Sequence, residues 1–133
     1  MIAKAVKHLD RRPLVFVVED EKAYRSYLGS TLENNGYDVY CFENGKQVLE
    51  LLHHIIPDLI LSDIDMPLMD GFELQDNIKK ELDSFQIPLI YLTARQKSSD
   101  IERAVELGAK AILKKPSMSY VIIDTIRQTL NKK

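Results

Sequence analysis

The chain has 133 residues, a net charge of -2 from 18 Lys and Arg against 20 Asp and Glu, and 45% hydrophobic residues. This length predicts one domain, the charge excludes a protein that binds nucleic acid mainly by neutralising phosphates, and the composition excludes wholesale disorder. No apolar run approaches the roughly 20 residues of a membrane span, and the one cysteine, Cys41, is expected to be buried rather than reactive. We therefore expect a cytoplasmic protein in which residues 13–133 form the domain and residues 1–12 an N-terminal extension.

Short runs of branched apolar residues alternate with segments of helical periodicity along the chain. The five runs that predict strands are Leu14–Val18, Tyr37–Phe42, Asp58–Leu61, Ile87–Leu92 and Ala111–Leu113. Most of them lack the polar alternation of a half-exposed strand, which is typical of strands buried on both faces of a parallel sheet. The run Tyr37–Phe42 is more mixed, as expected for an edge strand.

Five segments between and after these strands have apolar residues at intervals of three and four. The residues that carry this periodicity are Tyr24, Tyr27, Leu28 and Leu32, then Val48, Leu51, Leu52 and Ile55, then Phe72, Leu74, Ile78 and Leu82, then Ala104, Val105 and Leu107, and finally Ile122, Ile123, Ile126 and Leu130. Helix starts are predicted at Asn44, at Asp70 with Glu73 as a capping box, and at Ser99 with Glu102. This strict alternation predicts an α/β fold, a doubly wound (βα)5 sandwich with helices on both faces of one parallel sheet.

Acidic residues follow the first and third predicted strands. Glu19 and Asp20 come directly after the first strand, and Asp63 comes after the third. Because the ligand crevice of an open α/β sheet lies beyond the carboxyl ends of its strands, these acids are expected to gather there. Carboxylates that gather repel one another unless a cation or a shared proton intervenes, and a small set of oxygen ligands suits Mg²⁺. Any one of these acids alone is more simply a solvated loop residue, but the three together favour a metal site.

A hydroxyl and an ammonium reach the same edge of the predicted sheet. Thr93 follows the fourth strand and Lys115 the fifth. An aspartate such as Asp63 can act as a nucleophile and form an acyl phosphate. The Lys115 ammonium could neutralise charge on the transferred group while Thr93 donates to one of its oxygens. These residue types together predict phosphoryl chemistry.

Four segments have the order and spacing of motifs in a known family. They are VVED at 17–20, SDIDMPLMDG at 62–71, LTA at 92–94 and KP at 115–116. From Pro13 to about Leu130 the chain resembles the CheY-like receiver domain of bacterial two-component response regulators. The resemblance implies a flavodoxin-like sheet with strand order 2-1-3-4-5, and a cis bond between Lys115 and Pro116.

The resemblance also implies roles for the residues at the sheet edge. Asp63 would be the phosphoacceptor, and Thr93 and Lys115 would contact the phosphoryl group. The implied ligands of Mg²⁺ or Mn²⁺ are Glu19, Asp20, Asp63 and the backbone carbonyl of Asp65.

Partners and activity follow from the same resemblance. The phosphoryl donor would be a sensor histidine kinase or a histidine phosphotransfer protein. The output would be altered binding of a downstream effector through the face made by the fourth helix, the fifth strand and the fifth helix. Such a domain phosphorylates and dephosphorylates itself and is not an enzyme that turns over an external substrate. We expect no membrane association and no direct binding of nucleic acid.

The sequence departs from the family pattern at four places, one of which is Glu19, where the family more commonly has Asp. The family usually has an aromatic switch residue where this chain has Ile112, so a rotating aromatic side chain is missing and Ile112 is expected simply to pack. Ser117 replaces a common Phe and is predicted to cap the last helix. The segment GAKAILKKP at 108–116 lacks the acidic pair of regulators that dimerise through that face, so a homodimer there is left open.

Asp65 lies two residues after Asp63, and Arg95 lies two residues after Thr93. We expect these two side chains to border the crevice, and we hypothesise that they form an ion pair that partly covers the phosphoryl group and modulates its lifetime. Two solvated charges are the simpler alternative.

Two other functions remain open. One is a degenerate receiver that binds partners without phosphorylation. The other is an aspartyl-phosphate hydrolase of the haloacid-dehalogenase type, whose D-x-D motif the segment 63–65 echoes. Those enzymes carry the motif on the first strand, usually with Thr or Val where this chain has Pro67, which makes the hydrolase the weaker alternative.

Overall fold

The computed structural model describes residues 11–82 and 86–131, so residues 1–10 of the predicted extension lie outside the described residues. The last two residues of that extension bond to the domain. The Arg11 guanidinium lies 2.8 Å from the Asp58 carboxylate, and Arg12 donates to the backbone carbonyls of Glu33 and Tyr37.

Five parallel strands form one sheet with the order β2-β1-β3-β4-β5. The strands are β1 (Leu14–Val18), β2 (Asp38–Phe42), β3 (Leu59–Ser62), β4 (Leu89–Thr93) and β5 (Ala111–Lys114). Their bounds differ from the predicted ones by at most two residues. The largest difference is at β4, which begins directly after Pro88, a residue without a backbone N–H to donate to a neighbouring strand. The predicted flavodoxin-like topology is confirmed.

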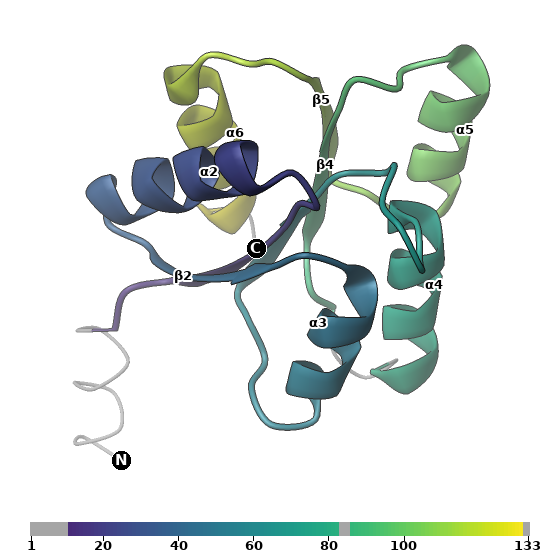
Figure 1. Cartoon of the computed structure of the whole chain (residues 1–133), viewed down its shortest axis with the longest axis horizontal. Helices are drawn as coiled ribbons and strands as arrows, with labels where there is room; N and C mark the ends of the chain where they lie inside the picture. The colour runs from purple at the N-terminus through teal and green to yellow at the C-terminus, as the bar shows by residue number, and fades with distance from the viewer. Residues whose placement is uncertain (1–10, 83–85, 132–133) are drawn as a thin grey trace.

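Helices cover both faces of the sheet, as Figure 1 shows. They are α2 (Lys22–Asn34), α3 (Gly45–Leu52), α4 (Gly71–Glu81), α5 (Ser98–Glu106) and α6 (Ser119–Asn131). Alternate side chains of β1 point to opposite faces, so Phe16 and Val18 pack with α3, α4 and α5, and Val15 and Val17 pack with α2 and α6. Both faces of the central strands are therefore buried, which explains their continuous apolar sequence.

Two of the predicted helix starts are confirmed. The Asn44 side chain accepts a hydrogen bond from the backbone N–H of Gln47 and so caps α3. At α4, Asp70 accepts from the backbone N–H of Glu73, whose carboxylate accepts from the backbone N–H of Asp70. This capping box fixes the start of the helix that follows the Asp63 loop.

Two other capping predictions are wrong. Helix α5 begins at Ser98, so Ser99 lies inside the helix, and it is Asp100 that accepts from the backbone N–H before it, that of Lys97. Ser117 precedes the first residue of α6 by two positions, and its hydroxyl donates to the carbonyl of Lys114 instead. At α5 a second polar side chain takes the backbone N–H group, and at α6 the Ser117 hydroxyl takes a different backbone partner, which the local pattern does not show.

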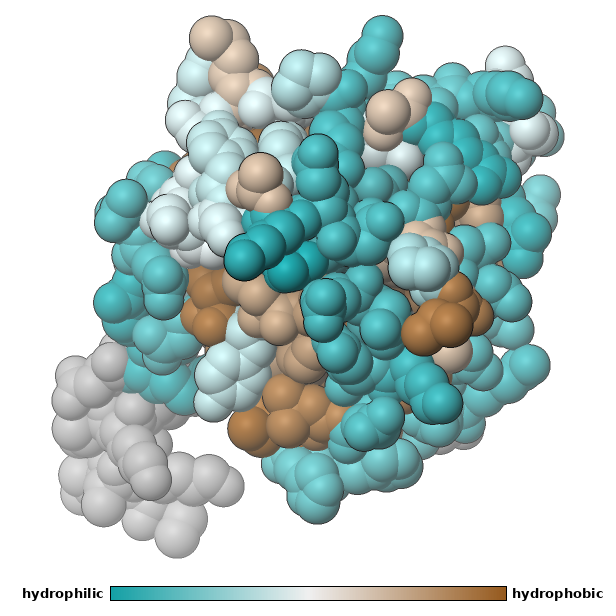
Figure 2. Space-filling view, viewed as in Figure 1, coloured by the Kyte–Doolittle hydropathy of each residue, from teal (hydrophilic) through white to brown (hydrophobic). Residues whose placement is uncertain are grey.

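The prediction that Cys41 is buried is also wrong, because β2 is an edge strand with an incompletely covered outer region. Its neighbour Tyr40 is likewise exposed. Figure 2 shows apolar side chains reaching the surface in the strip between α2 and α3 on a face that is otherwise mostly hydrophilic. Partial burial raises the pKa of the Cys41 thiol, which disfavours the reactive thiolate.

Within the described ranges, no helix has the length and hydropathy needed to cross a membrane.

Candidate functional site

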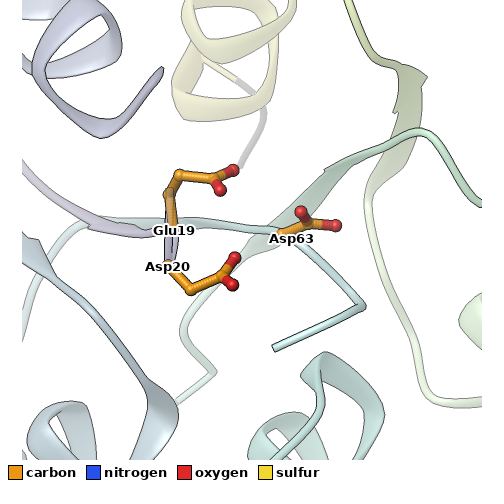
Figure 3. A group of neighbouring side chains, drawn as sticks. All are labelled: Glu19, Asp20 and Asp63. Carbon is orange, nitrogen blue, oxygen red and sulfur yellow. The ribbon is translucent and has the colours of Figure 1, made fainter. Parts of the chain in front are cut away.

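Three carboxylates meet at the carboxyl edge of the sheet. Glu19 and Asp20 follow β1, Asp63 follows β3, and one oxygen of each lies within 4.8 Å of the others. Figure 3 shows Glu19 and Asp20 extending toward Asp63. The backbone N–H of Glu19 donates to the carbonyl of Phe42, and that of Asp63 donates to the carbonyl of Val18, so hydrogen bonds to neighbouring strands continue to the site itself. The predicted gathering of the acids is therefore present.

Lys115 lies between two of these acids. Its Nζ atom is 2.6 Å from Glu19 Oε1 and 2.9 Å from Asp63 Oδ2. Burial raises the pKa of Glu19, although the hydrogen bond from Lys115 opposes this shift. Burial alone would lower the pKa of Lys115, but its hydrogen bonds to Glu19 and Asp63 outweigh this effect and raise it. The ammonium is thus retained as the counter-charge of two buried carboxylates.

Hydrogen bonds orient the two oxygens of Asp63 differently. Oδ1 accepts from the backbone N–H of Ile64 at 2.6 Å and, more weakly, from that of Asp65 at 3.3 Å. Oδ2 faces the Lys115 ammonium. Asp63 is 7% exposed, so its side chain is largely shielded from solvent. This arrangement presents one oriented oxygen next to a positive charge.

Thr93 ends β4 with a buried hydroxyl. Its Oγ1 accepts a hydrogen bond of 3.1 Å from the backbone N–H of Arg95. Since a hydroxyl that accepts still carries its own proton, Thr93 retains a donor for a ligand oxygen. The peptide bond between Lys115 and Pro116 is cis, as expected from the resemblance.

The predicted ion pair of Arg95 and Asp65 is present. Arg95 Nη1 lies 2.8 Å from Asp65 Oδ1. The structure adds a second partner that the sequence did not indicate, because Arg95 Nε lies 3.0 Å from the buried carboxylate of Asp100. The S-x-x-E pattern at 99–102 predicted a helix start at Ser99, whereas α5 begins at Ser98 and has Asp100 in its first turn.

Two residues of α2 support the site and were also missed. The Lys115 ammonium lies 4.7 Å from the centre of the Tyr24 ring, a cation–π contact. The Arg25 guanidinium donates to the backbone carbonyls of Glu19 and Asp20 and so fixes the turn that carries both acids. Their only sequence signal was the helical spacing of Tyr24, which is equally typical of a core residue.

Ile112 packs against the core shared with α3, α4 and α5, as expected. It lies opposite Tyr91 in the register of β4 and β5. The buried Tyr91 hydroxyl is within hydrogen-bonding distance of the Gly71 carbonyl (3.0 Å) and of Gln75 Oε1 (2.7 Å). The aromatic ring opposite Ile112 is therefore that of Tyr91 on β4, and its hydroxyl lies within hydrogen-bonding distance of α4.

The donor set fits a hard divalent cation. Glu19, Asp20 and Asp63 supply oxygen atoms only, and their mutual approach concentrates negative charge at one point. Asp20 is exposed, which leaves room for the water ligands that Mg²⁺ retains. That the backbone carbonyl of Asp65 also binds the metal stays a prediction.

We expect Mg²⁺ to stabilise the fold through this cluster. At a concentration ten times its Kd, MgCl2 should raise the free energy of unfolding by about 1.4 kcal/mol, because the ion binds the folded state alone. Urea unfolding at constant ionic strength, with and without MgCl2, measures this shift. In Asp20→Asn the shift should shrink, and in Asp76→Asn, which alters an exposed ion pair on α4, it should persist. Equal shifts in wild type and Asp20→Asn would contradict the site.

Comparison with known proteins agrees with this geometry. The acidic cluster, Lys115 and Thr93 all lie at the carboxyl edge of the sheet of an α/β sandwich. The family model described as response regulator receiver domain matches residues 15–127. The chain therefore belongs to the response regulator receiver family.

Solved structures of receiver domains resemble the chain closely. The receiver domain of a signal transduction histidine kinase from Syntrophus aciditrophicus is 33% identical, with a TM-score of 0.80 and 89% of each chain covered. The chemotaxis protein CheY4 of Vibrio cholerae is 25% identical, with a TM-score of 0.83 and coverage of 89% of this chain and 98% of that one. The receiver domain of an HD domain-containing protein from Pseudomonas fluorescens Pf-5 is 27% identical, with a TM-score of 0.82 and coverage of 90% and 95%.

Proposed function

We propose that this receiver domain takes a phosphoryl group from a phosphohistidine donor onto Asp63 in a Mg²⁺-dependent reaction in the cytoplasm. The donor would be a sensor histidine kinase or a histidine phosphotransfer protein. The observation that carries the proposal is the position of Asp63 Oδ2, which lies 2.9 Å from the Lys115 ammonium and within the acidic cluster of Glu19 and Asp20. Family membership supports the phosphorylation-dependent signalling role.

The residues of the site suit this transfer. The Asp63 carboxylate forms the new bond to phosphorus while the bond from phosphorus to the donor's imidazole nitrogen breaks, and the imidazole leaves with the electron pair. Lys115 offsets the charge of the phosphoryl oxygens, and Thr93 donates its remaining proton to one of them. Mg²⁺ bound by Glu19, Asp20 and Asp63 would supply further positive charge beside those oxygens.

The output we propose is altered affinity for an effector through the face made by α5, β5 and α6. Lys115, which directly follows β5, contacts Asp63, and Thr93 ends β4 at the same edge of the sheet, so we expect new charge at Asp63 to bias the arrangement of these strands. Ile101 and Val105, one turn apart on α5, are both exposed and offer apolar contact area. A homodimer through the same face is an alternative use of it. With no aromatic residue at 112, shifts of the backbone and of α5 would carry the change.

The domain would act as a switch and not as an enzyme on an external substrate. The phosphoryl group stays on Asp63 until water removes it, so each transfer ends in one modified protein. The hydrolase alternative is disfavoured because Asp63 follows the third strand and Pro67 lies within its loop. The degenerate receiver is disfavoured because acids, lysine and threonine are all in place.

The test is incubation with acetyl phosphate and MgCl2, followed by intact-mass measurement. Wild type should gain one phosphoryl group, and Asp63→Asn should gain none, whereas Asp76→Asn on the surface of α4 should behave as wild type. No adduct on wild type with either acetyl phosphate or phosphoramidate would favour the degenerate receiver. Continuous release of product from a phosphomonoester would favour the hydrolase.

We propose that the ion pair of Arg95 and Asp65 covers part of the approach to Asp63 and slows the loss of the phosphoryl group. Arg95→Ala should shorten the acyl-phosphate half-life roughly two- to fivefold, the range set by an ion pair of modest strength. The half-life is measured by intact mass after the phosphodonor is removed. An unchanged half-life would remove the covering role and leave the phosphoacceptor role of Asp63 untouched.

A further inference from the structure

Arg95 links two elements that border the phosphoacceptor. Its Nη1 donates to Asp65 Oδ1 at 2.8 Å, on the loop after Asp63. Its Nε donates to Asp100 Oδ1 at 3.0 Å, in the first turn of α5. The guanidinium group is planar and rigid, so the direction of Nε determines where Nη1 can point. Arg95 therefore connects the first turn of α5 to the loop that follows Asp63.

The two ends of this line differ in how firmly they are held. The Asp65 side chain is 66% exposed, and an ion pair of that kind contributes little by itself. The Asp100 side chain is 6% exposed, and a buried carboxylate is retained only when it is paired and hydrogen-bonded. Both of its oxygens have partners, since Oδ2 accepts from the backbone N–H of Lys97 at 3.2 Å. The contact with Asp100 therefore fixes the Arg95 side chain more firmly than the contact with Asp65 does.

Further contacts limit the freedom of Arg95. Its backbone N–H donates to the Thr93 hydroxyl, which fixes the start of the side chain. The guanidinium carbon lies 5.9 Å from the centre of the Phe72 ring, on α4. Of the two ion pairs of Arg95, the one with Asp65 is exposed and the one with Asp100 is partly buried.

We propose that Asp100 is a positioning residue, which acts through Arg95 to hold the guanidinium group over the approach to Asp63 and so prolongs the acyl phosphate. This proposal rests on the proposed function. Without the Asp100 carboxylate, Nε loses its partner and Arg95 samples positions that leave the phosphoryl group open to water. Asp65 alone, being exposed, does not compensate for this loss.

A double-mutant cycle on the phosphorylated protein tests the proposal. Asp100→Asn should shorten the half-life of the acyl phosphate roughly two- to threefold in wild type and should have no further effect in Arg95→Ala. The matched control is Asp76→Asn, which removes the same charge from an exposed pair with Lys80 on α4 and should leave the half-life unchanged. Equal shortening by Asp100→Asn with and without Arg95 would overturn the proposal, as would a half-life identical to wild type.

A second measurement needs no phosphorylation and separates this proposal from the proposed function. In ¹H–¹⁵N spectra the Nε–H signal of Arg95 should exchange slowly with water in wild type and in Asp76→Asn, and fast in Asp100→Asn. Thermal unfolding of each variant confirms that it is folded. A slowly exchanging Nε–H signal in folded Asp100→Asn would overturn the positioning role. The result of this measurement does not depend on whether Asp63 accepts a phosphoryl group.

Discussion

Replacement of Lys115 by methionine should lower the free energy of unfolding by about 3 kcal/mol at pH 7 without divalent ions, because it leaves buried carboxylates uncompensated. Glu19 is 2% exposed and Asp63 7%, and each accepts a hydrogen bond from the Lys115 ammonium. Methionine retains most of the side-chain volume, so the loss reports the charge rather than a cavity. Urea unfolding in the presence of a chelator measures it.

The matched control is Lys114→Met, which removes an exposed lysine at the preceding position. Surface substitutions of this kind usually change stability by no more than about 0.5 kcal/mol. Addition of MgCl2 should recover much of the loss in Lys115→Met, because a divalent cation again compensates the acids. Equal stability of the two methionine variants would show that Lys115 is not the counter-charge of the site.

The pH dependence of this loss has a definite sign. Burial already raises the pKa of Glu19 from its ordinary value of 4.5, and removal of Lys115 raises it further. A carboxyl group with a raised pKa destabilises the fold where it is ionised and stops doing so once it is protonated. The difference between Lys115→Met and wild type should therefore be largest near pH 7 and shrink as the pH falls through the raised pKa of Glu19.

Gly71→Ala should lower the free energy of unfolding by about 3 kcal/mol, the upper range for overpacking a rigid site. A Cβ atom at this position would lie 2.4 Å from the Asp63 carbonyl oxygen and 3.0 Å from the Ile64 Cα atom. These are backbone atoms of Asp63 and Ile64, and their shift would displace the Asp63 side chain as well. Chemical denaturation gives the stability, and the rate of labelling by acetyl phosphate, expected to fall, gives the effect on the site.

Gly29→Ala is the control for this substitution. A Cβ atom there would meet only the Cys41 Sγ atom, at 3.1 Å, which lies at the end of a side chain and can move. Gly29 lies inside α2, where alanine is favoured over glycine by about 1 kcal/mol, so this variant should be at least as stable as wild type. If Gly71→Ala and Gly29→Ala unfold at the same denaturant concentration, the close approach of backbone atoms at Gly71 does not affect the free energy of unfolding.

Most of the architecture was predictable from local pattern. Continuous apolar runs such as Leu14–Val18 indicated strands buried on both faces, and their alternation with helical periodicity left a doubly wound sheet as the simplest arrangement. Because the strands are parallel, residues at their carboxyl ends had to meet at one edge. The grouping of Glu19, Asp63 and Lys115 followed from that constraint, although they are far apart in the sequence.

Other contacts depend on how side chains compete for partners in three dimensions. The pattern of Ser99 and Glu102 predicted a helix start that gave no role to Asp100. Asp65 was the predicted partner of Arg95, and the structure adds Asp100 as a second one. The exposure of Cys41 depends on the incomplete cover of the edge strand β2. A short stretch of sequence shows the hydrogen-bond donors and acceptors of neighbouring residues. It does not show the donors and acceptors that other helices and strands bring close in the folded protein.

By itself, the sequence determined the sheet, the family motifs and the chemical character of the site, because periodicity and strand ends carry that information. The tertiary structure alone decided that Lys115 lies between Glu19 and Asp63, that Tyr24 flanks it, and that Arg95 is anchored on α5. The physical reason is that buried charges are stable only with partners at hydrogen-bonding distance. Such distances arise from the packing of helices on the sheet, which no local pattern records.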